Sequence, residues 1–220
     1  MKPGFDLSVY LVTDPVLNGG RPVDEVVAQA VRGGVSMVQL RDPHSPTRVL
    51  VDTARRLVAQ LRPLAIPFIV NDRIDVAMAA GADGVHIGQK DMDARDARCM
   101  MGEDCIVGLS VANETELEAS RDALGAVDYL GVGPVFATAT KPDAGEAIGL
   151  DGIAWMRAAT SLPLVAIGGI DAARTADIMR AGANGVAIVS AIMNAADPQK
   201  AAAEFTRAVT DGIKAEERGK

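Results

Sequence analysis

The chain has 220 residues, 49% of them hydrophobic, which is enough to bury the core of one α/β domain of ordinary size. Its formal net charge is −7 and its pI is about 4.9, so it lacks the basic surface that broad nucleic-acid binding requires. The two cysteines, Cys99 and Cys105, are too few for a disulfide scaffold and fit neither a metal-binding nor a CxxC pattern.

The hydropathy pattern argues against membranes and secretion. No apolar run approaches the roughly 18 residues that cross a bilayer, and the first residues do not form a signal peptide. We therefore expect a cytoplasmic protein without a nucleic-acid or membrane partner.

Short apolar runs alternate with amphipathic segments along the chain. The runs are rich in β-branched residues and are followed by polar residues or glycine, which is typical of buried parallel strands. The expected strands are 7–13, 35–40, 68–70, 84–87, 105–110, 128–132, 164–167 and 185–189. The expected helices, read from apolar periodicity and capping residues, are 22–32, 47–61, 74–80, 91–101, 113–124, 151–160, 172–180 and 198–213.

Eight strands alternating with eight helices predict an α/β fold, a (β/α)8 TIM barrel. We expect a single domain over residues 1–220, with a frayed tail from about residue 214. The segments 80–87 (AGADGVHI) and 181–188 (AGANGVAI) echo each other, each as a helix end, a glycine stop and the next strand. A doubly wound open sheet is the alternative, but it commonly carries a glycine-rich fingerprint where this chain has Asp14 and Pro15.

Polar residues and glycines follow almost every expected strand. In a parallel barrel these positions form the rim that carries the active site. Singly, each residue fits a helix cap or a turn, but together at one rim they predict a functional site. They are Gln39, Arg41, Asn71, Asp72, Gln89, Asp91, Ser110, Thr138, Thr140, Lys141, Gly168, Gly169 and Ser190.

Asp72 and Asp91 follow neighbouring strands, so both are expected at the same edge of the sheet. Two carboxylates with an open side suit Mg²⁺, which prefers oxygen ligands and leaves room for phosphate oxygens. The alternative is that each aspartate caps the helix that follows it.

The remaining rim residues suggest two anionic ligands. Cations, hydroxyl and amide donors and the carboxylate pair describe a pyrophosphate held through Mg²⁺ near strands two to five. Gly168, Gly169 and Ser190 resemble the phosphate pocket that many barrels form after strands seven and eight. No Ser-His-Asp set or rim thiol is found, and His86, inside a strand, is expected to be a hydrogen-bonded wall residue.

Six segments occur in the order found in thiamine-phosphate synthases, and the chain resembles that family from about the first strand to the eighth. GPVFATATK, together with the ND and GQKD pair, is the most specific part of the match, whereas AIGGI is shared by many phosphate-binding barrels. The segments are VQLRD (38–42), VNDRIDVAMAAGADGVHIGQKD (70–91), VGLS (107–110), GVGPVFATATK (131–141), VAIGGI (165–170) and IVSAI (188–192).

The resemblance implies a transferase of thiamine biosynthesis. Such an enzyme condenses 4-amino-2-methyl-5-(diphosphooxymethyl)pyrimidine with a thiazole monophosphate and releases pyrophosphate. The reaction is dissociative: pyrophosphate leaves, and the thiazole nitrogen captures the pyrimidine carbocation, so no protein nucleophile is needed.

The resemblance also assigns residues to ligands. Mg²⁺ would be held by Asp72 and Asp91. The pyrimidine pyrophosphate would be held by Gln39, Arg41, Asn71, Ser110 and Lys141, with Arg41, Ser110 and Lys141 in catalytic roles. The thiazole phosphate would be held by Thr138, Thr140, Gly169, Val189 and Ser190.

One position departs from the family pattern Gln-x-Arg-x-Lys after the second strand, because this chain has Pro43 at the lysine position. A cation for the pyrophosphate is therefore missing, and His44 and Arg48 are the nearby candidates to replace it. Three alternatives stay open: a thiazole phosphate tautomerase-like paralogue, a non-catalytic protein that binds thiazole phosphate or thiamine phosphate, and another phosphosugar-type barrel. A homo-oligomer paired through outer helices is compatible with each.

Overall fold

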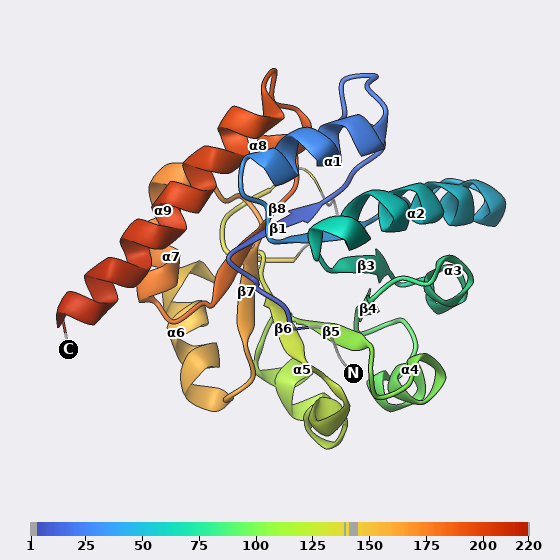
Figure 1. The fold of residues 1–220 in the computed structure, drawn as a ribbon. Helices are drawn as coiled ribbons and strands as arrows, with labels where there is room; N and C mark the ends of the chain where they lie inside the picture. Colours follow the sequence, from blue (N-terminus) through green and yellow to red (C-terminus); the bar gives the residue numbers. More distant parts are fainter. Residues whose placement is uncertain (1–3, 139, 141–144, 220) are drawn as a thin grey trace.

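The computed structural model describes residues 4–138, 140 and 145–219, and side chains as far as residue 214. Eight parallel strands form a closed barrel surrounded by helices (Figure 1). Each strand pairs with the next, and the ring closes where β8 pairs with β1. The predicted TIM barrel is therefore confirmed. The strands are β1 (Val9–Val12), β2 (Met37–Leu40), β3 (Phe68–Asn71), β4 (Gly84–Ile87), β5 (Ile106–Val111), β6 (Tyr129–Val132), β7 (Leu164–Ile167) and β8 (Gly185–Ile188).

The helices cover the outside of the barrel. Three of them, α2, α3 and α7, have the bounds that the sequence pattern predicts. The α-helices are α1 (Val23–Arg32), α2 (Thr47–Leu61), α3 (Ile74–Ala80), α4 (Ala94–Met101), α5 (Glu114–Ala119), α6 (Gly149–Ala159), α7 (Ala172–Arg180), α8 (Ser190–Met193) and α9 (Pro198–Gly219), with 3₁₀ turns η1 (Arg62–Leu64) and η2 (Arg121–Ala126).

The helix expected over 113–124 is divided into α5 and the 3₁₀ segment η2. Asn113 caps α5 as predicted, its side chain accepting from the Glu116 amide. The break falls at Ser120, whose hydroxyl contacts the Gln89 side chain and whose carbonyl accepts from Ala123 in a tighter i to i+3 turn. A tertiary contact thus overrides the local helical pattern.

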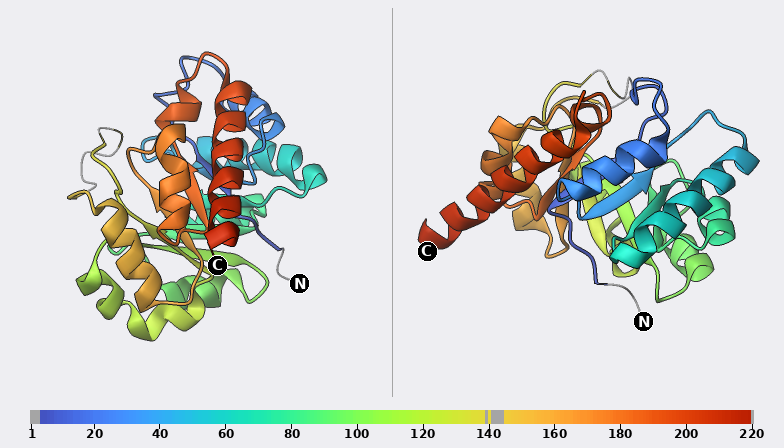
Figure 2. Two further views of the ribbon diagram at one scale, coloured as in Figure 1. Left: turned by 90° about the vertical axis from the view of Figure 1, so that its left-hand side faces the viewer. Right: turned by 45° about the horizontal axis from the view of Figure 1, so that its top comes forward.

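The C-terminal elements differ most from the predicted ones. The short helix α8 follows β8 at the rim, and α9 then runs along the outside of the barrel, where it packs against α7 and α1. Figure 2 shows α9, in red, beside the orange α7. The helix α9 continues to Gly219, beyond the end at Ile213 that the pattern predicts and through the segment expected to be a frayed tail.

At the end of the barrel opposite the rim, three polar side chains link the starts of neighbouring strands through equivalent hydrogen bonds. Each stands just before an even-numbered strand and accepts the backbone N–H of a residue near the start of the strand before it. This contact explains the echo between 80–87 and 181–188, which places Asp83 and Asn184 at equivalent positions. The bonds are Phe68 N to Asp83 Oδ2 (2.9 Å), Val107 N to Asp128 Oδ2 (2.8 Å) and Leu164 N to Asn184 Oδ1 (2.9 Å).

The apolar core has two parts. The larger lies between the barrel and the helices, and the smaller fills the barrel interior with residues such as Met37, Ile69, Ile106 and Val165. Among the described residues, none of the helices combines the length and the hydropathy that a bilayer-spanning segment needs. The filled interior leaves the open rim as the place for a ligand.

Candidate active site

A cavity of about 520 Å³ opens at the carboxyl ends of the strands. Every predicted rim residue that the structure describes lines it, whereas Lys141 lies outside the described residues. The topology thus brings together residues that are scattered along the sequence. The predicted residues that line the cavity are Gln39, Arg41, Asn71, Asp72, Gln89, Asp91, Ser110, Thr138, Thr140, Gly168, Gly169, Val189 and Ser190.

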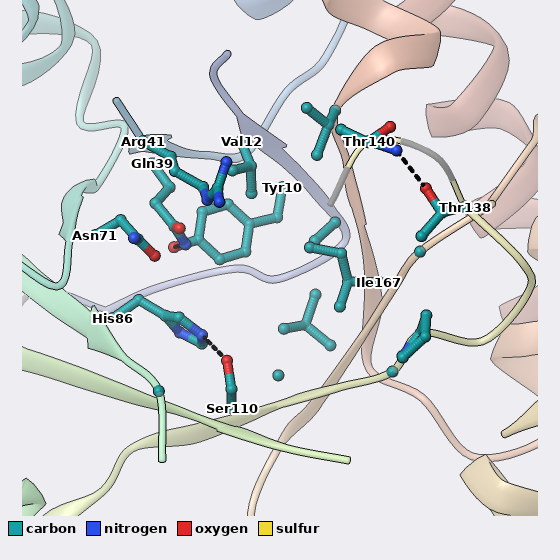
Figure 3. A pocket seen from close by; sticks show the side chains of 18 of the residues that line it. Tyr10, Val12, Gln39, Arg41, Asn71, His86, Ser110, Thr138, Thr140 and Ile167 are labelled. Atoms are coloured by element: carbon teal, nitrogen blue, oxygen red, sulfur yellow. Dashed lines mark hydrogen bonds between the residues drawn. The ribbon is translucent and has the colours of Figure 1, made fainter. Parts of the chain in front are cut away.

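The labelled side chains fall on two sides of the cavity (Figure 3). Gln39 of β2, Arg41 directly after β2 and Asn71 of β3 lie on one side, and Thr138 and Thr140, from the loop after β6, lie on the other. The loop is held locally, since the Thr140 amide donates to Thr138 Oγ1 at 3.2 Å. The arrangement offers room for two ligands that meet in the middle.

A buried threonine fixes the backbone at the Arg41 side. The amide of Arg41 donates to Thr13 Oγ1 at 3.0 Å, and the amide of Thr13 donates to the Gln39 carbonyl at 2.9 Å. Thr13 is 1% exposed, so this anchor sits below the cavity surface. The Thr13 contacts hold the backbone of Gln39 and Arg41, and they do not involve the Arg41 guanidinium.

Asp72 reaches the rim through an unusual backbone conformation. Its φ is +58°, in the left-handed region that costs a non-glycine residue about 1–2 kcal/mol and that Asp and Asn tolerate best. The turn is held by the Asp72 amide, which donates to the His86 carbonyl at 2.8 Å, and by Asn71 Nδ2, which donates to Asp72 Oδ2 at 2.6 Å. Strain of this kind gathers at functional sites.

Neither aspartate of the pair caps the helix that follows it. Asp91 Oδ2 accepts from the Gly88 amide at 2.8 Å and closes the turn after β4. The helix after Asp72 starts behind Arg73 without a side-chain cap, and the helix after Asp91 is capped by Asp93. The capping alternative is therefore wrong, and the cavity is the feature that Asp72 and Asp91 share.

The charges on the cavity wall are unbalanced. Among the described lining residues the cations are Arg41 and Lys90, and the carboxylates are Asp72, Asp91 and Glu116. These two cations do not outnumber the three carboxylates, so a pyrophosphate group would gain little net attraction from the described lining residues without a metal cation. The described residues contain no group of three or more His, Cys, Asp or Glu placed to hold a metal by themselves. The carboxylate pair fits Mg²⁺, which takes its other ligands from phosphate and water.

Two glycines shape the end of β7. Gly168 and Gly169 have φ of +99° and +65°, and the loop after β6 packs closely against both. A Cβ at Gly168 would lie 2.6 Å from Pro134 Cβ, and one at Gly169 would lie 2.7 Å from the Ala137 carbonyl oxygen. Side chains there would push away the loop that carries Thr138.

Sequence reasoning missed several residues of the wall, among them Lys90, Glu116 and Tyr10. Lys90 lines the cavity, and its position directly before Asp91 is the signal that could have found it. Tyr10 also lines the cavity, although its strand reads as an apolar core segment. The candidates for the missing lysine, His44 and Arg48, are not among the lining residues, so Lys90 is the better placed cation.

His86 is a hydrogen-bonded wall residue, as predicted. It is 8% exposed, its Nε2 lies 2.8 Å from Ser110 Oγ (Figure 3), and its Nδ1 lies 2.9 Å from Tyr129 Oη. The ring also stacks on that of Tyr129, with centroids 5.5 Å apart.

The comparisons with known proteins agree with this geometry. A family model described as "Thiamine monophosphate synthase" matches residues 9–192. The chain is 54% identical to a thiamine-phosphate synthase from Azorhizobium caulinodans, over 92% of this chain and 94% of that protein. It is 56% identical to one from Xanthobacter autotrophicus, over 95% and 98%. A solved thiamine phosphate pyrophosphorylase from Pyrococcus furiosus superposes with a TM-score of 0.85, at 35% identity over 94% of this chain and 97% of that one.

Proposed function

The chain belongs to the thiamine monophosphate synthase family, and we propose that the two sides of its rim cavity hold the two substrates of the family reaction. It is a transferase that condenses 4-amino-2-methyl-5-(diphosphooxymethyl)pyrimidine with a thiazole monophosphate to give thiamine phosphate and pyrophosphate. This placement of the substrates is supported by one observation. One group of lining side chains, Arg41, Gln39 and Asn71, lies across the cavity from the other, Thr138 and Thr140.

The pyrimidine pyrophosphate belongs on the β2–β5 side. Gln39, Asn71 and Ser110 supply amide and hydroxyl groups there, and Arg41 supplies a fixed-charge donor suited to phosphate oxygens. Lys141, which follows Thr140 in sequence and lies outside the described residues, is assigned to the same substrate by the family motif.

The thiazole phosphate belongs on the β6–β8 side. Thr138 and Thr140 offer hydroxyl groups from the loop after β6, and Gly169 keeps backbone accessible at the end of β7. Val189 and Ser190 complete this side at the start of α8. A compact cluster of hydroxyl groups and backbone suits a monophosphate.

Asp72 and Asp91 would hold Mg²⁺. The support is the oxygen-only pair on one wall together with the net negative charge of the described lining residues. When bound, Mg²⁺ supplies the positive charge that neutralises the pyrophosphate as it leaves. The strained turn at Asp72 and the Gly88–Asp91 turn keep the two carboxylates at the rim.

The protein's own part in the reaction is electrostatic. Arg41 and Ser110 line the cavity where charge grows on the leaving pyrophosphate, and the family motif assigns Lys141 to the same charge. The amino group of the pyrimidine feeds electrons to the exocyclic carbon as the bond breaks. The cavity holds the thiazole nitrogen against that carbon. Water must be kept out, because it would compete for the cation.

We infer that the enzyme acts in the cytoplasm on small molecules, without a nucleic-acid or membrane partner, and that residues 1–220 work as one barrel domain. The net charge of −7 supports the absence of a nucleic-acid partner. A homo-oligomer is compatible with this fold, and light scattering on the purified protein measures the oligomeric state.

The test of the proposed function is pyrophosphate release from the purified protein. Release is expected only when both substrates and Mg²⁺ are present, and EDTA should abolish it. Release without the thiazole phosphate would indicate hydrolysis instead of transfer. No release, combined with tight binding of the thiazole phosphate alone, would favour the tautomerase-like or non-catalytic binding alternatives.

A further inference from the structure

Five polar side chains cross the barrel interior from one strand to another. Gln39 Nε2 donates to Tyr10 Oη at 2.8 Å, and Tyr10 Oη lies 2.9 Å from Tyr129 Oη. Tyr129 Oη lies 2.9 Å from His86 Nδ1, and His86 Nε2 lies 2.8 Å from Ser110 Oγ. We call these five residues the polar bridge. Both of its ends, Gln39 and Ser110, line the cavity, while Tyr129 is fully buried beneath it.

The barrel makes room for this bridge at the expense of apolar packing. Barrel interiors are usually filled by branched apolar side chains, but β5 and β6 carry glycines at the two positions nearest the imidazole. A Cβ at Gly108 would lie 2.2 Å from Tyr129 Cζ and 2.5 Å from His86 Nδ1. A Cβ at Gly131 would lie 2.9 Å from His86 Cε1. Neither glycine has a positive φ, so space and not backbone conformation is what requires them.

Counting protons gives the bridge a direction. The Gln39 amide nitrogen can only donate, so Tyr10 Oη accepts from it, and the Tyr10 proton is left to point to Tyr129 Oη, the other oxygen that Tyr10 contacts. In the same direction the proton of Tyr129 goes to His86 Nδ1, and an imidazole that accepts at Nδ1 carries its proton on Nε2. With that direction Nε2 donates to Ser110 Oγ, which leaves the Ser110 proton for an acceptor outside the bridge.

Burial keeps both phenols in the state that this direction needs. It raises the pKa of Tyr10 and of Tyr129 well above the usual value, so each retains its proton. Within the described residues, no buried side-chain nitrogen or oxygen lacks a hydrogen-bond partner. A fully satisfied buried network is rigid, and its bonds strengthen one another.

We propose that the polar bridge acts as one directional unit, which fixes His86 as the Nε2–H tautomer and makes Ser110 a hydrogen-bond donor to the pyrimidine pyrophosphate. Tyr10, Tyr129 and His86 are positioning residues in this scheme, because they act through Gln39 and Ser110. The scheme rests on the proposed function in that Gln39 and Ser110 hold the same substrate. The opposite polarity, with the Gln39 amide turned over, would make Ser110 an acceptor, and the test separates the two.

The tautomer is measured without substrate. The chain has two histidines, so ¹⁵N-histidine labelling with long-range ¹H–¹⁵N correlation gives two ring systems, and His44→Gln assigns them. His86 is expected to show a protonated Nε2 and an unprotonated Nδ1. Tyr129→Phe should shift the Nδ1 resonance, whereas Tyr10→Phe leaves the Tyr129 hydroxyl in place and should shift it less. A proton on Nδ1, a charged ring, or no change in Tyr129→Phe would overturn the proposal.

Coupling between the two ends tests the bridge as a unit. Gln39→Ala and Ser110→Ala, alone and combined, should be non-additive in kcat/KM by at least about threefold. The same cycle in a Tyr129→Phe background should be additive. Tyr10→Phe breaks a different link and provides the comparison should Tyr129→Phe fail to fold. Equal coupling in all backgrounds would overturn the proposal. Absence of pyrophosphate release from the wild type would instead reject the proposed function, which the tautomer measurement does not require.

Discussion

Asp72 and Asp91 line one cavity from the ends of adjacent strands, although a helix and a strand separate them in the sequence. This relationship makes them the candidate metal ligands. Asp72→Asn or Asp91→Asn is expected to lower turnover at least about 100-fold, equivalent to about 2.7 kcal/mol of transition-state stabilisation, and to raise the Mg²⁺ concentration needed for half-maximal rate.

The measurement is pyrophosphate release as a function of Mg²⁺, with circular dichroism to show that the fold is intact. Asp75→Asn is the matched control, because Asp75 forms an exposed ion pair with Arg73 and does not line the cavity. Wild-type activity in either rim variant would remove the metal assignment.

Lys90 is expected to take over part of the role of the missing lysine at position 43. Lys90→Ala should raise the KM for the pyrimidine pyrophosphate about tenfold, equivalent to about 1.4 kcal/mol, because one cation of the described cavity wall is lost. Steady-state kinetics with each substrate varied in turn check this. Arg48→Ala is the control, and a larger effect there than at Lys90 would assign the role to Arg48.

Lys141 is expected to act on the leaving group. Lys141→Ala should lower kcat by about 100- to 1000-fold, the usual loss when one donor to a developing negative charge is removed. Pre-steady-state measurement of pyrophosphate formation separates the chemical step from product release. If the only change were a higher KM for the thiazole phosphate, the leaving-group role would be wrong.

Arg98 is expected to stabilise the end of the barrel opposite the rim. Its guanidinium donates to Asp128 at 2.6 Å and to the carbonyls of Ala126 and Cys105, with its side chain only 9% exposed. Arg98→Ala should lower the free energy of unfolding by about 3–5 kcal/mol, because it leaves buried acceptors and a carboxylate without their cation. Urea denaturation tests this.

The matched control lies on the same helix. Arg95 forms an ion pair with Asp93 but is 63% exposed, so Arg95→Ala should lower the free energy of unfolding far less than Arg98→Ala does. Equal losses in the two variants would show that the burial of the Arg98 pair is not what stabilises the fold.

The sequence was most informative where hydrophobic period and capping agree. Helix α7 has the predicted bounds because its apolar stripe begins directly after Asp171, whose side chain caps the helix by accepting from the Arg174 amide. The division at Ser120 could not be predicted, since it depends on a contact with Gln89 from another loop. The length of α9 was also missed, because polar residues past Ile213 continue a helix that packs through its other face.

For the site, a position directly after an expected strand was enough to predict the rim residues that the structure describes. It could not find Tyr10 or Tyr129, because a tyrosine inside a short apolar strand reads as core whether or not its hydroxyl has a partner. The strand register decides which side chains point into the barrel, and that register depends on how all eight strands close the ring. The sequence of one strand therefore does not show that Tyr10 and Tyr129 meet. The assignment of residues to substrates still rests on family resemblance and geometry, and the variants above test it.

The closure of the ring has a consequence for biosynthesis. β2, one neighbour of β1, is the next strand in chain order, but the other neighbour, β8, is synthesised only after β2 to β7. Until then β1 presents an open parallel edge, which is a template for wrong pairing and aggregation. Because α9 packs against both α1 and α7, it covers the two sides of this seam. The nascent chain therefore depends on α9, which follows all eight strands in chain order, to hold the first strand in place.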